Sequence, residues 1–77
     1  RDGARRDLRM RMVPVASSDL AAVGYEHGTL YVEFHSGGTY RYTGVPECVH
    51  RELMAAPSHG RYFHRFIRNS FPYQKVG

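Results

Sequence analysis

The sequence predicts an α+β fold: a three-stranded antiparallel meander followed by two helices packed on one face. Ahead of Gly44, three short runs of alternating apolar and polar residues are separated by glycine-containing turns, a pattern typical of antiparallel hairpins. After Pro46 the apolar residues recur at helical spacing instead. At 77 residues the chain is long enough for one small core, so we expect one domain over residues 12–77.

The first two strands are expected at about residues 20–25 and 30–35. In the first, strict alternation puts Val23 and Tyr25 on one face, and Leu20 on the opposite face with small residues that would let a helix approach closely. Gly28 in the intervening turn is free to take positive φ. The second strand has the clearest period, with Leu30, Val32 and Phe34 alternating with Tyr31, Glu33 and His35.

The third strand, expected at residues 39–43, contains Tyr40, Arg41 and Tyr42. Aromatic side chains beside an arginine on a sheet are how several RNA-binding modules stack unpaired bases. Strand parity favours a packing role for the tyrosines, because Thr39, Arg41 and Thr43 cannot form the apolar face that the neighbouring strand requires. We therefore predict that both tyrosines face the helices and that Arg41 lies on the open face.

Two helices are predicted after the sheet. Pro46 suits the start of the first, Glu47 complements its dipole, and Pro57 ends it after about residue 56. Ser58 is the expected N-cap of the second helix, which would run to about residue 69. Val45, Val49, Leu53 and Ala56 would form the buried stripe of the first helix; Phe63, Phe66, Ile67 and Ser70 would form the apolar edge of the second.

Charge is distributed unevenly along a chain whose formal net charge is +4. Residues 1–11 carry five Arg and two Asp and show no helical or strand period, so we expect a basic N-terminal arm or a linker. Residues 47–77 are also basic, whereas the strands are not. The single Cys48 and the lack of an apolar segment of about 20 residues indicate a protein of the cytoplasm with no membrane contact.

Several short motifs appear together in a fixed order: Val23-Gly24-Tyr25, Gly38-x-Tyr40-x-Tyr42, Val45-Pro46, Ser58-x-Gly60-x-Tyr62-Phe63 and Ile67-Arg68. With Ser17-Ser18 and the alternating second strand, they resemble the KTSC domain family over about residues 12–73. That module is named after the C-terminus of some lysyl-tRNA synthetases and also occurs as a small stand-alone bacterial protein. The resemblance implies a domain of uncharacterised function for which RNA binding is the suggested role. Where the family often has Asn after Tyr-Phe, this chain has His64.

The first functional hypothesis is a small non-catalytic accessory module that binds nucleic acid, with RNA or tRNA as its partner. Arg61, His64, Arg65 and Arg68 would share one helix face and follow a phosphate backbone. Arg41 and Lys75 would add phosphate contacts, and Tyr31 would stack a base. The alternative for the helix row is an ordinary solvated face.

The second hypothesis is a protein–protein interaction module. A short outer strand would offer an unpaired edge to a partner, and a patch of tyrosines and arginines would supply the binding energy. The sequence leaves the choice between an RNA partner and a protein partner open.

Catalysis, metal binding and cofactor binding are not predicted. Cys48 and His50 are two residues apart and leave a helix on nearly opposite sides, so they do not form a nucleophile–base pair. The spacing of the five His residues matches no zinc site. Gly37-Gly38 is placed as a hairpin turn, not as a phosphate-binding loop.

Overall fold

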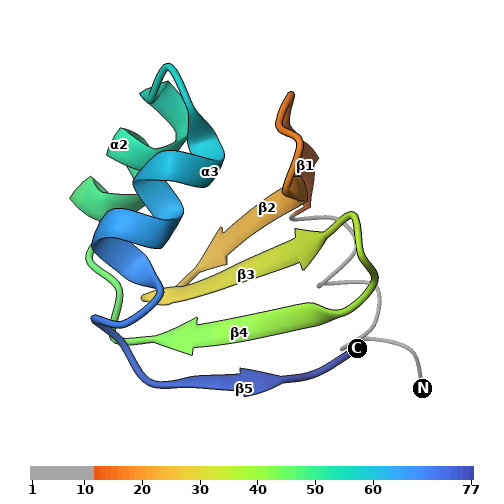
Figure 1. Ribbon diagram of the computed structural model, residues 1–77. Helices are drawn as coiled ribbons and strands as arrows, with labels where there is room; N and C mark the ends of the chain where they lie inside the picture. The colour runs from red at the N-terminus through yellow and green to blue at the C-terminus, as the bar shows by residue number, and fades with distance from the viewer. Residues whose placement is uncertain (1–11) are drawn as a thin grey trace.

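The computed structural model describes residues 12–77 of the protein. They form one antiparallel sheet with helices on one side (Figure 1). The sheet has five strands in sequence order, and the helical segment lies between the fourth and the fifth. The α+β class and the central meander are confirmed, and the sheet gains a short strand at each edge. The elements are β1 (Val13–Pro14), β2 (Leu20–Glu26), β3 (Thr29–Phe34), β4 (Thr39–Thr43), α2 (Glu47–Ala55), α3 (His59–Tyr62), η1 (Phe63–Ile67) and β5 (Tyr73–Lys75).

Tight turns set the register of the meander. His27 and Gly28 both have positive φ, 53° and 78°, in the two-residue loop that joins β2 to β3. Such loops match the twist of antiparallel strands, which is why glycine is favoured there. Gly37 and Gly38 also have positive φ in the β3–β4 turn. The predicted hairpin turns are therefore present.

The two faces of β4 are occupied as strand parity predicts. Tyr42 pairs with Leu30 and Tyr40 with Val32, so both tyrosines lie on the face that packs against the helices. Tyr42 is only 4% exposed, and Tyr40 is partly buried against the core. Arg41 pairs with residue 31 of β3 and therefore lies on the opposite face.

One strand departs from simple alternation. Leu20 pairs with Phe34, whereas Ala22 pairs with Glu33, so an irregularity between positions 20 and 22 adds a residue to β2. A bulge of this kind reverses side-chain parity along one strand. Leu20 consequently joins Val23 in the core and is fully buried, and our expectation that it lies on the opposite face is wrong.

The first helix forms close to its expected limits. Pro46 takes the extended conformation just ahead of α2, and Leu53 is the buried residue of the helix. Ser58 caps the next helix as predicted, because its hydroxyl accepts a hydrogen bond from the Arg61 backbone N–H at 3.2 Å. His59 links the two helices through a 2.9 Å hydrogen bond between Nδ1 and the Leu53 carbonyl oxygen.

The second helix differs from the prediction because α3 continues as a wider π-helical segment, η1. The Arg68 backbone N–H donates to the Phe63 carbonyl at 2.9 Å, a bond that spans five residues instead of four. Phe63 and Ile67 are buried, whereas Phe66 is 49% exposed and Ser70 is also exposed. The predicted apolar edge is thus wrong for Phe66 and Ser70, and the helix ends before residue 69.

The predicted N-terminal arm, residues 1–11, lies outside the described residues. Within residues 12–77, the helices are too short or too polar to cross a bilayer.

Candidate nucleic-acid interface

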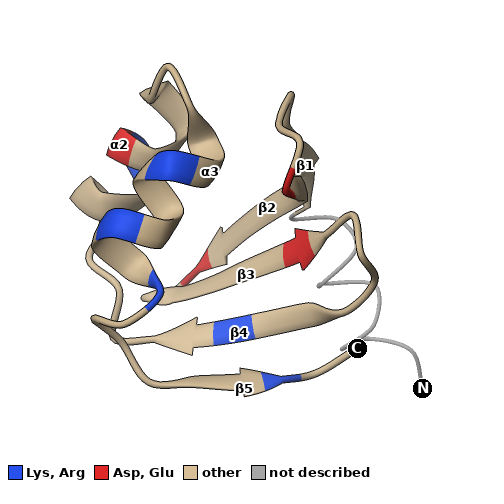
Figure 2. Cartoon of the chain, in the orientation of Figure 1, with Lys and Arg blue, Asp and Glu red and all other residues tan. Residues whose placement is uncertain are grey.

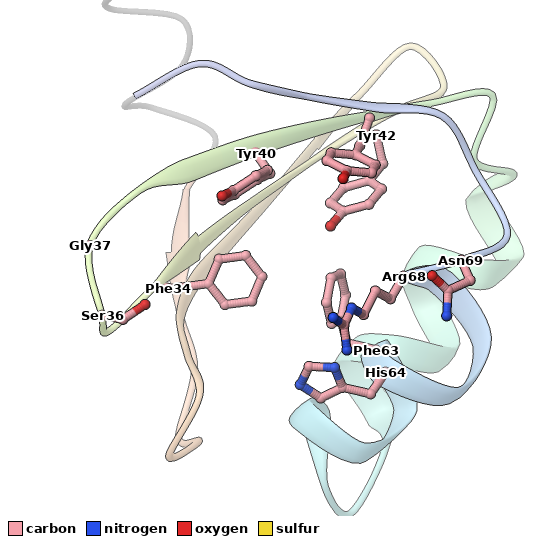
Figure 3. Close-up of a pocket in the computed structure, with 10 residues that line it drawn as sticks. Phe34, Ser36, Gly37, Tyr40, Tyr42, Phe63, His64, Arg68 and Asn69 are labelled. Atoms are coloured by element: carbon pink, nitrogen blue, oxygen red, sulfur yellow. The ribbon is translucent and has the colours of Figure 1, made fainter.

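The helices leave part of the sheet face uncovered, and a cleft of about 390 Å³ opens there (Figure 3). One wall is the helix-facing side of β3, β4 and β5, and the other wall is η1 with the residues that follow it. Five of the lining residues are aromatic: Phe34, Tyr40, Tyr42, Phe63 and Tyr73.

The aromatic rings form a continuous contact network around the cleft. Phe34 meets Tyr40 and Phe63 nearly edge-on, with ring centroids 5.6 and 5.4 Å apart. Tyr42 lies 5.4 Å from Phe63 and 5.5 Å from Tyr73, and Tyr73 lies 5.9 Å from Tyr40. Tyr73 is 61% exposed, so the network reaches from the core to solvent. A ligand with a flat apolar face would find ring surface here that is already fixed in place.

The π-helical turn brings Phe63 and Arg68 together. In a regular helix a residue five positions later points well away from the first, whereas a wider turn brings it back toward the same side. Arg68 therefore borders the cleft beside Phe63, together with His64 and Asn69 (Figure 3). Segments of π-helix are frequent at functional sites, because they redirect side chains at a cost in helix geometry.

His64 is held in place by the carboxylate of a residue that lies 45 positions earlier in the sequence. Its Nε2 lies 2.8 Å from Oδ2 of Asp19, in the segment between β1 and β2. The backbone N–H of Asp19 in turn donates to Oγ of Ser17 at 3.1 Å. The ring also meets Phe63 edge-on at 5.3 Å. Both side chains of the pair are about half exposed, so this contact orients the imidazole at the mouth of the cleft rather than in the core.

Tyr42 contributes a hydroxyl that stays protonated. Burial raises the pKa of Tyr42, the neighbouring Tyr73 and Tyr40 raise it further, and Arg68 acts in the opposite direction. A phenol in this state donates a hydrogen bond and adds no negative charge to the cleft.

The model of the KTSC domain family matches residues 16–71, which contain the cleft apart from Tyr73 and the short strand β5. The chain belongs to the KTSC domain family. A crystal structure of a KTSC domain protein from Yersinia pestis is similar, with a TM-score of 0.83 and 40% identity over 86% of this chain and 96% of that chain.

Two kinds of curated relative resemble this KTSC domain. An uncharacterised protein of Stutzerimonas stutzeri is 43% identical over 61 residues, 77% of this chain and 86% of its own length. Lysine–tRNA ligases of Trichormus variabilis and of a Nostoc species are each 50% identical over 48 residues, 62% of this chain. The match spans only 9% of the length of these ligases.

The predicted row of basic helix residues is divided in the KTSC domain. His64 and Arg68 border the cleft, whereas Arg61 and Arg65 border a separate shallow hollow of about 230 Å³ on another side of the helix. There the guanidinium of Arg65 lies 5.5 Å from the centre of the exposed Phe66 ring. The wide turn separates the two pairs, which a regular helix would hold in one row.

Tyr62 supports the outer hollow. Its ring lies 4.7 Å from that of Phe66, as the spacing of four residues predicts. Its hydroxyl donates to Oε1 of Glu52 on α2 at 2.6 Å. Burial and this carboxylate raise the pKa of Tyr62 to about 12. The hollow is thus lined by two aromatic rings in contact with each other and by two arginines.

Arg41 and Tyr31 lie together, but on the face of the sheet away from the cleft. They are cross-strand partners, and Arg41 is also paired with Gln74 of β5, whose Oε1 accepts a hydrogen bond from Nη2. The Nε of Arg41 is buried and has no hydrogen-bond partner among residues 12–77. Figure 2 shows the basic residues spread over the helical segment, β4 and β5. Arg41 and Arg68 therefore belong to different surfaces.

Lys75 lies on the cleft side of the sheet, at its edge. It pairs with Tyr40, and a Cβ added to Gly38 would come within 3.3 Å of the Lys75 Cε. The lysine side chain therefore packs along the β3–β4 turn, near the cleft but not among the residues that line it.

Several residues of the site were not predicted as site residues from the sequence, among them Asp19, Phe34, Phe63 and Tyr73. Tyr73 and Lys75 alternate after a proline, which is a weak signal of an edge strand. Asp19 directly precedes the first long strand, but nothing in the sequence connects it to His64, which lies 45 positions later.

Metal ligands do not gather in the part of the chain that the structure describes: within residues 12–77 there is no group of three or more His, Cys, Asp or Glu side chains placed to hold an ion. Cys48 is a free, exposed thiol on α2.

Proposed function

We propose that this KTSC domain is a non-catalytic module of the cytoplasm that binds single-stranded RNA in the aromatic cleft. The observation that carries the proposal is the placement of Arg68 and His64 beside an aromatic cluster on the sheet, in which Phe34 and Tyr40 are partly buried and Tyr73 is exposed. Bases stack on such rings with little regard to sequence, and arginine recognises the phosphates between them. Among known relatives, the lysine–tRNA ligases act on tRNA by name, which makes tRNA a natural RNA to test.

The proposal assigns different weights to the predicted contacts. Arg68, His64 and Lys75 lie on the cleft side and would act directly. Arg61 and Arg65 would add a longer-range attraction from the outer side of the helix. Arg41 and Tyr31 lie on the opposite face, so they would contribute little.

Fluorescence anisotropy with a labelled single-stranded RNA tests the proposal. The logarithm of affinity should fall linearly with the logarithm of salt concentration, and Arg68→Gln should reduce the slope by about 0.7. Replacing Tyr40 with Leu should remove about 1–3 kcal/mol of binding free energy, the usual value of one stacked base.

Tyr31→Leu is the matched control, because it removes the same ring from the opposite face of the neighbouring strand. The proposal fails if single-stranded RNA does not bind, or if the control weakens binding as much as the Tyr40 variant does.

A protein-binding role is the second candidate, and Phe66 favours it. A phenylalanine that is 49% exposed, supported by Tyr62 and flanked by Arg65, has the composition of an interface hot spot. The outer edge of β5, which pairs with no further strand within residues 12–77, could add a strand from a partner. A partner retained after nuclease treatment, released by Phe66→Ala and unaffected by Tyr40→Leu, would assign this surface to protein binding.

A further inference from the structure

We infer that the cleft is a pocket for a single nucleotide unit, with the base against Phe34 and Tyr40 and the phosphate at Arg68 and His64. This inference rests on the proposed function and specifies its ligand: one base with its sugar and phosphate is sufficient for binding. The unit would come either from a free nucleotide or from an unpaired nucleotide of an RNA strand.

The size and the limits of the cleft point to one unit. Its volume of about 390 Å³ lies near the lower end of the range of about 300–1,000 Å³ that small-molecule sites occupy. Ser36 and Gly37 of the β3–β4 turn border one end, and Asn69 borders the other (Figure 3). The hollow beside Arg61 and Arg65 shares no lining residue with it. A continuous groove for several nucleotides would instead join these basic residues into one path.

The two walls of the cleft differ in chemistry, as the base and the phosphate of a nucleotide do. Phe34 and Tyr40 come from the sheet and offer ring surface, whereas Arg68 and His64 come from the helical segment and offer a guanidinium charge and a hydrogen-bonding imidazole (Figure 3). A base needs a flat apolar partner, and a phosphate needs a cation with fixed geometry. A ligand that satisfies both walls carries an aromatic ring and an anion a short distance apart, as a nucleoside monophosphate does.

His64 places a hydrogen-bonding ring beside Arg68 at the phosphate end of the cleft. Its Nε2 lies 2.8 Å from Oδ2 of Asp19, so this contact occupies one ring nitrogen and holds the ring in place. The other ring nitrogen, Nδ1, is left for the ligand.

The test is an NMR and calorimetric titration of the full chain with adenosine monophosphate, adenosine and inorganic phosphate. We expect adenosine monophosphate to bind at least about tenfold more tightly than either part alone. Backbone signals of Tyr40, Phe63, His64 and Arg68 should shift together. Excess adenosine monophosphate should displace a labelled RNA oligonucleotide.

Variants separate the cleft from the outer hollow. His64→Gln and Arg68→Gln should each weaken binding of adenosine monophosphate at least about fivefold, whereas Arg65→Gln should weaken it by less than about twofold, because Arg65 borders the outer hollow and acts only at longer range. Dispersed amide spectra of the variants would show that they are folded.

The outcomes distinguish this inference from the proposed function. If an RNA oligonucleotide binds but adenosine monophosphate neither binds nor competes, the single-nucleotide pocket is wrong while RNA binding stands. If neither ligand binds, both are wrong. Inorganic phosphate that binds as tightly as the nucleotide would also overturn the inference, since the rings would then contribute nothing. If the pocket is supported, the relative affinities show where the bound unit comes from. Tighter binding of the oligonucleotide than of adenosine monophosphate indicates an RNA strand, and tighter binding of adenosine monophosphate indicates a free nucleotide.

Discussion

Nε2 of His64 lies 2.8 Å from Oδ2 of Asp19, so a helix residue and a residue ahead of the first long strand hold each other at the mouth of the cleft. Both side chains are about half exposed. Exposed ion pairs contribute only about 0–1 kcal/mol to stability. The contact therefore serves mainly to orient the imidazole.

The first prediction concerns the role of this contact. Asp19→Ala should lower the free energy of unfolding by no more than about 1 kcal/mol, yet weaken RNA binding, because the imidazole loses its fixed orientation. Urea denaturation and anisotropy measure the two quantities on the same sample. A gain in affinity would contradict the prediction, since it would show that the carboxylate only repels phosphate.

The second prediction concerns Gly60, which is buried where α3 approaches the segment before β2. A Cβ at this position would lie 3.4 Å from Oγ of Ser17 and 3.6 Å from Cβ of Asp19, which are ordinary contact distances. Glycine in a helix costs about 1 kcal/mol relative to alanine. Gly60→Ala should therefore leave the stability unchanged or raise it by up to about 1 kcal/mol.

Gly60→Leu provides the contrast, because its longer side chain has no space between the helix and Ser17. We expect it to destabilise the fold by about 1–3 kcal/mol, the usual cost of overpacking. Thermal or urea unfolding of both variants checks the pair. A large loss of stability in the alanine variant would contradict the prediction, because it would show that α3 lies closer to Ser17 and Asp19 than in the structure.

The fold was predictable where local patterns are strong. Alternation in β3 and the glycine turns were sufficient to assign the central meander, and parity correctly placed Tyr40 and Tyr42 toward the helices. The edge strands were not predictable, because two and three residues are too few for a period. They form through pairing with strands that are already in place, for example Tyr42 with Tyr73.

The candidate site was only partly predictable, for a related reason. Sequence reasoning assumes a constant number of residues per helical turn, and η1 breaks that assumption within the basic row. The extra residue in its turn exposes Phe66, leaves Ile67 buried as predicted, and separates Arg68 from Arg65. A bulge has the same effect at Leu20 in β2. Both irregularities are tertiary features that no local pattern in this chain marks.

The third prediction separates core residues from the exposed aromatic on the same helical layer. Leu53 and Ile67 are fully buried, so Leu53→Ala and Ile67→Ala should each cost about 2–5 kcal/mol. Phe66→Ala should cost much less, within about 1 kcal/mol, because half of its ring already faces solvent and it packs mainly on Tyr62. Urea denaturation measures these differences from the midpoints, provided that the slope of unfolding free energy against urea concentration is the same for every variant. A loss for Phe66 as large as that for Leu53 would mean that Phe66 belongs to the core after all.

The fourth prediction concerns the pH dependence of stability at His50. Its ring stacks on that of Tyr25 at 4.7 Å with the planes 7° apart, and partial burial lowers the pKa of His50 in the folded state. Glu47 acts in the opposite direction, and Arg51 adds to the lowering. The unfolded chain then takes up a proton at this residue at a higher pH than the folded protein does.

The sign of the effect follows from this order of protonation. Above about pH 6.5, the ordinary value for histidine, both states are neutral at His50 and its full contribution to stability is present. As the pH falls toward the lower folded-state pKa, the unfolded state is favoured and stability decreases. His50→Phe keeps an aromatic ring on Tyr25 and cannot titrate, so its urea midpoint should fall less than that of the wild type between about pH 7.5 and about pH 5.

His27→Asn is the matched control, because the His27 side chain is 89% exposed and asparagine tolerates its positive φ. This variant should retain the wild-type loss of stability on acidification. An equal loss in the His50→Phe variant would show that the acid sensitivity arises elsewhere, and the stacked pair would then have no part in it.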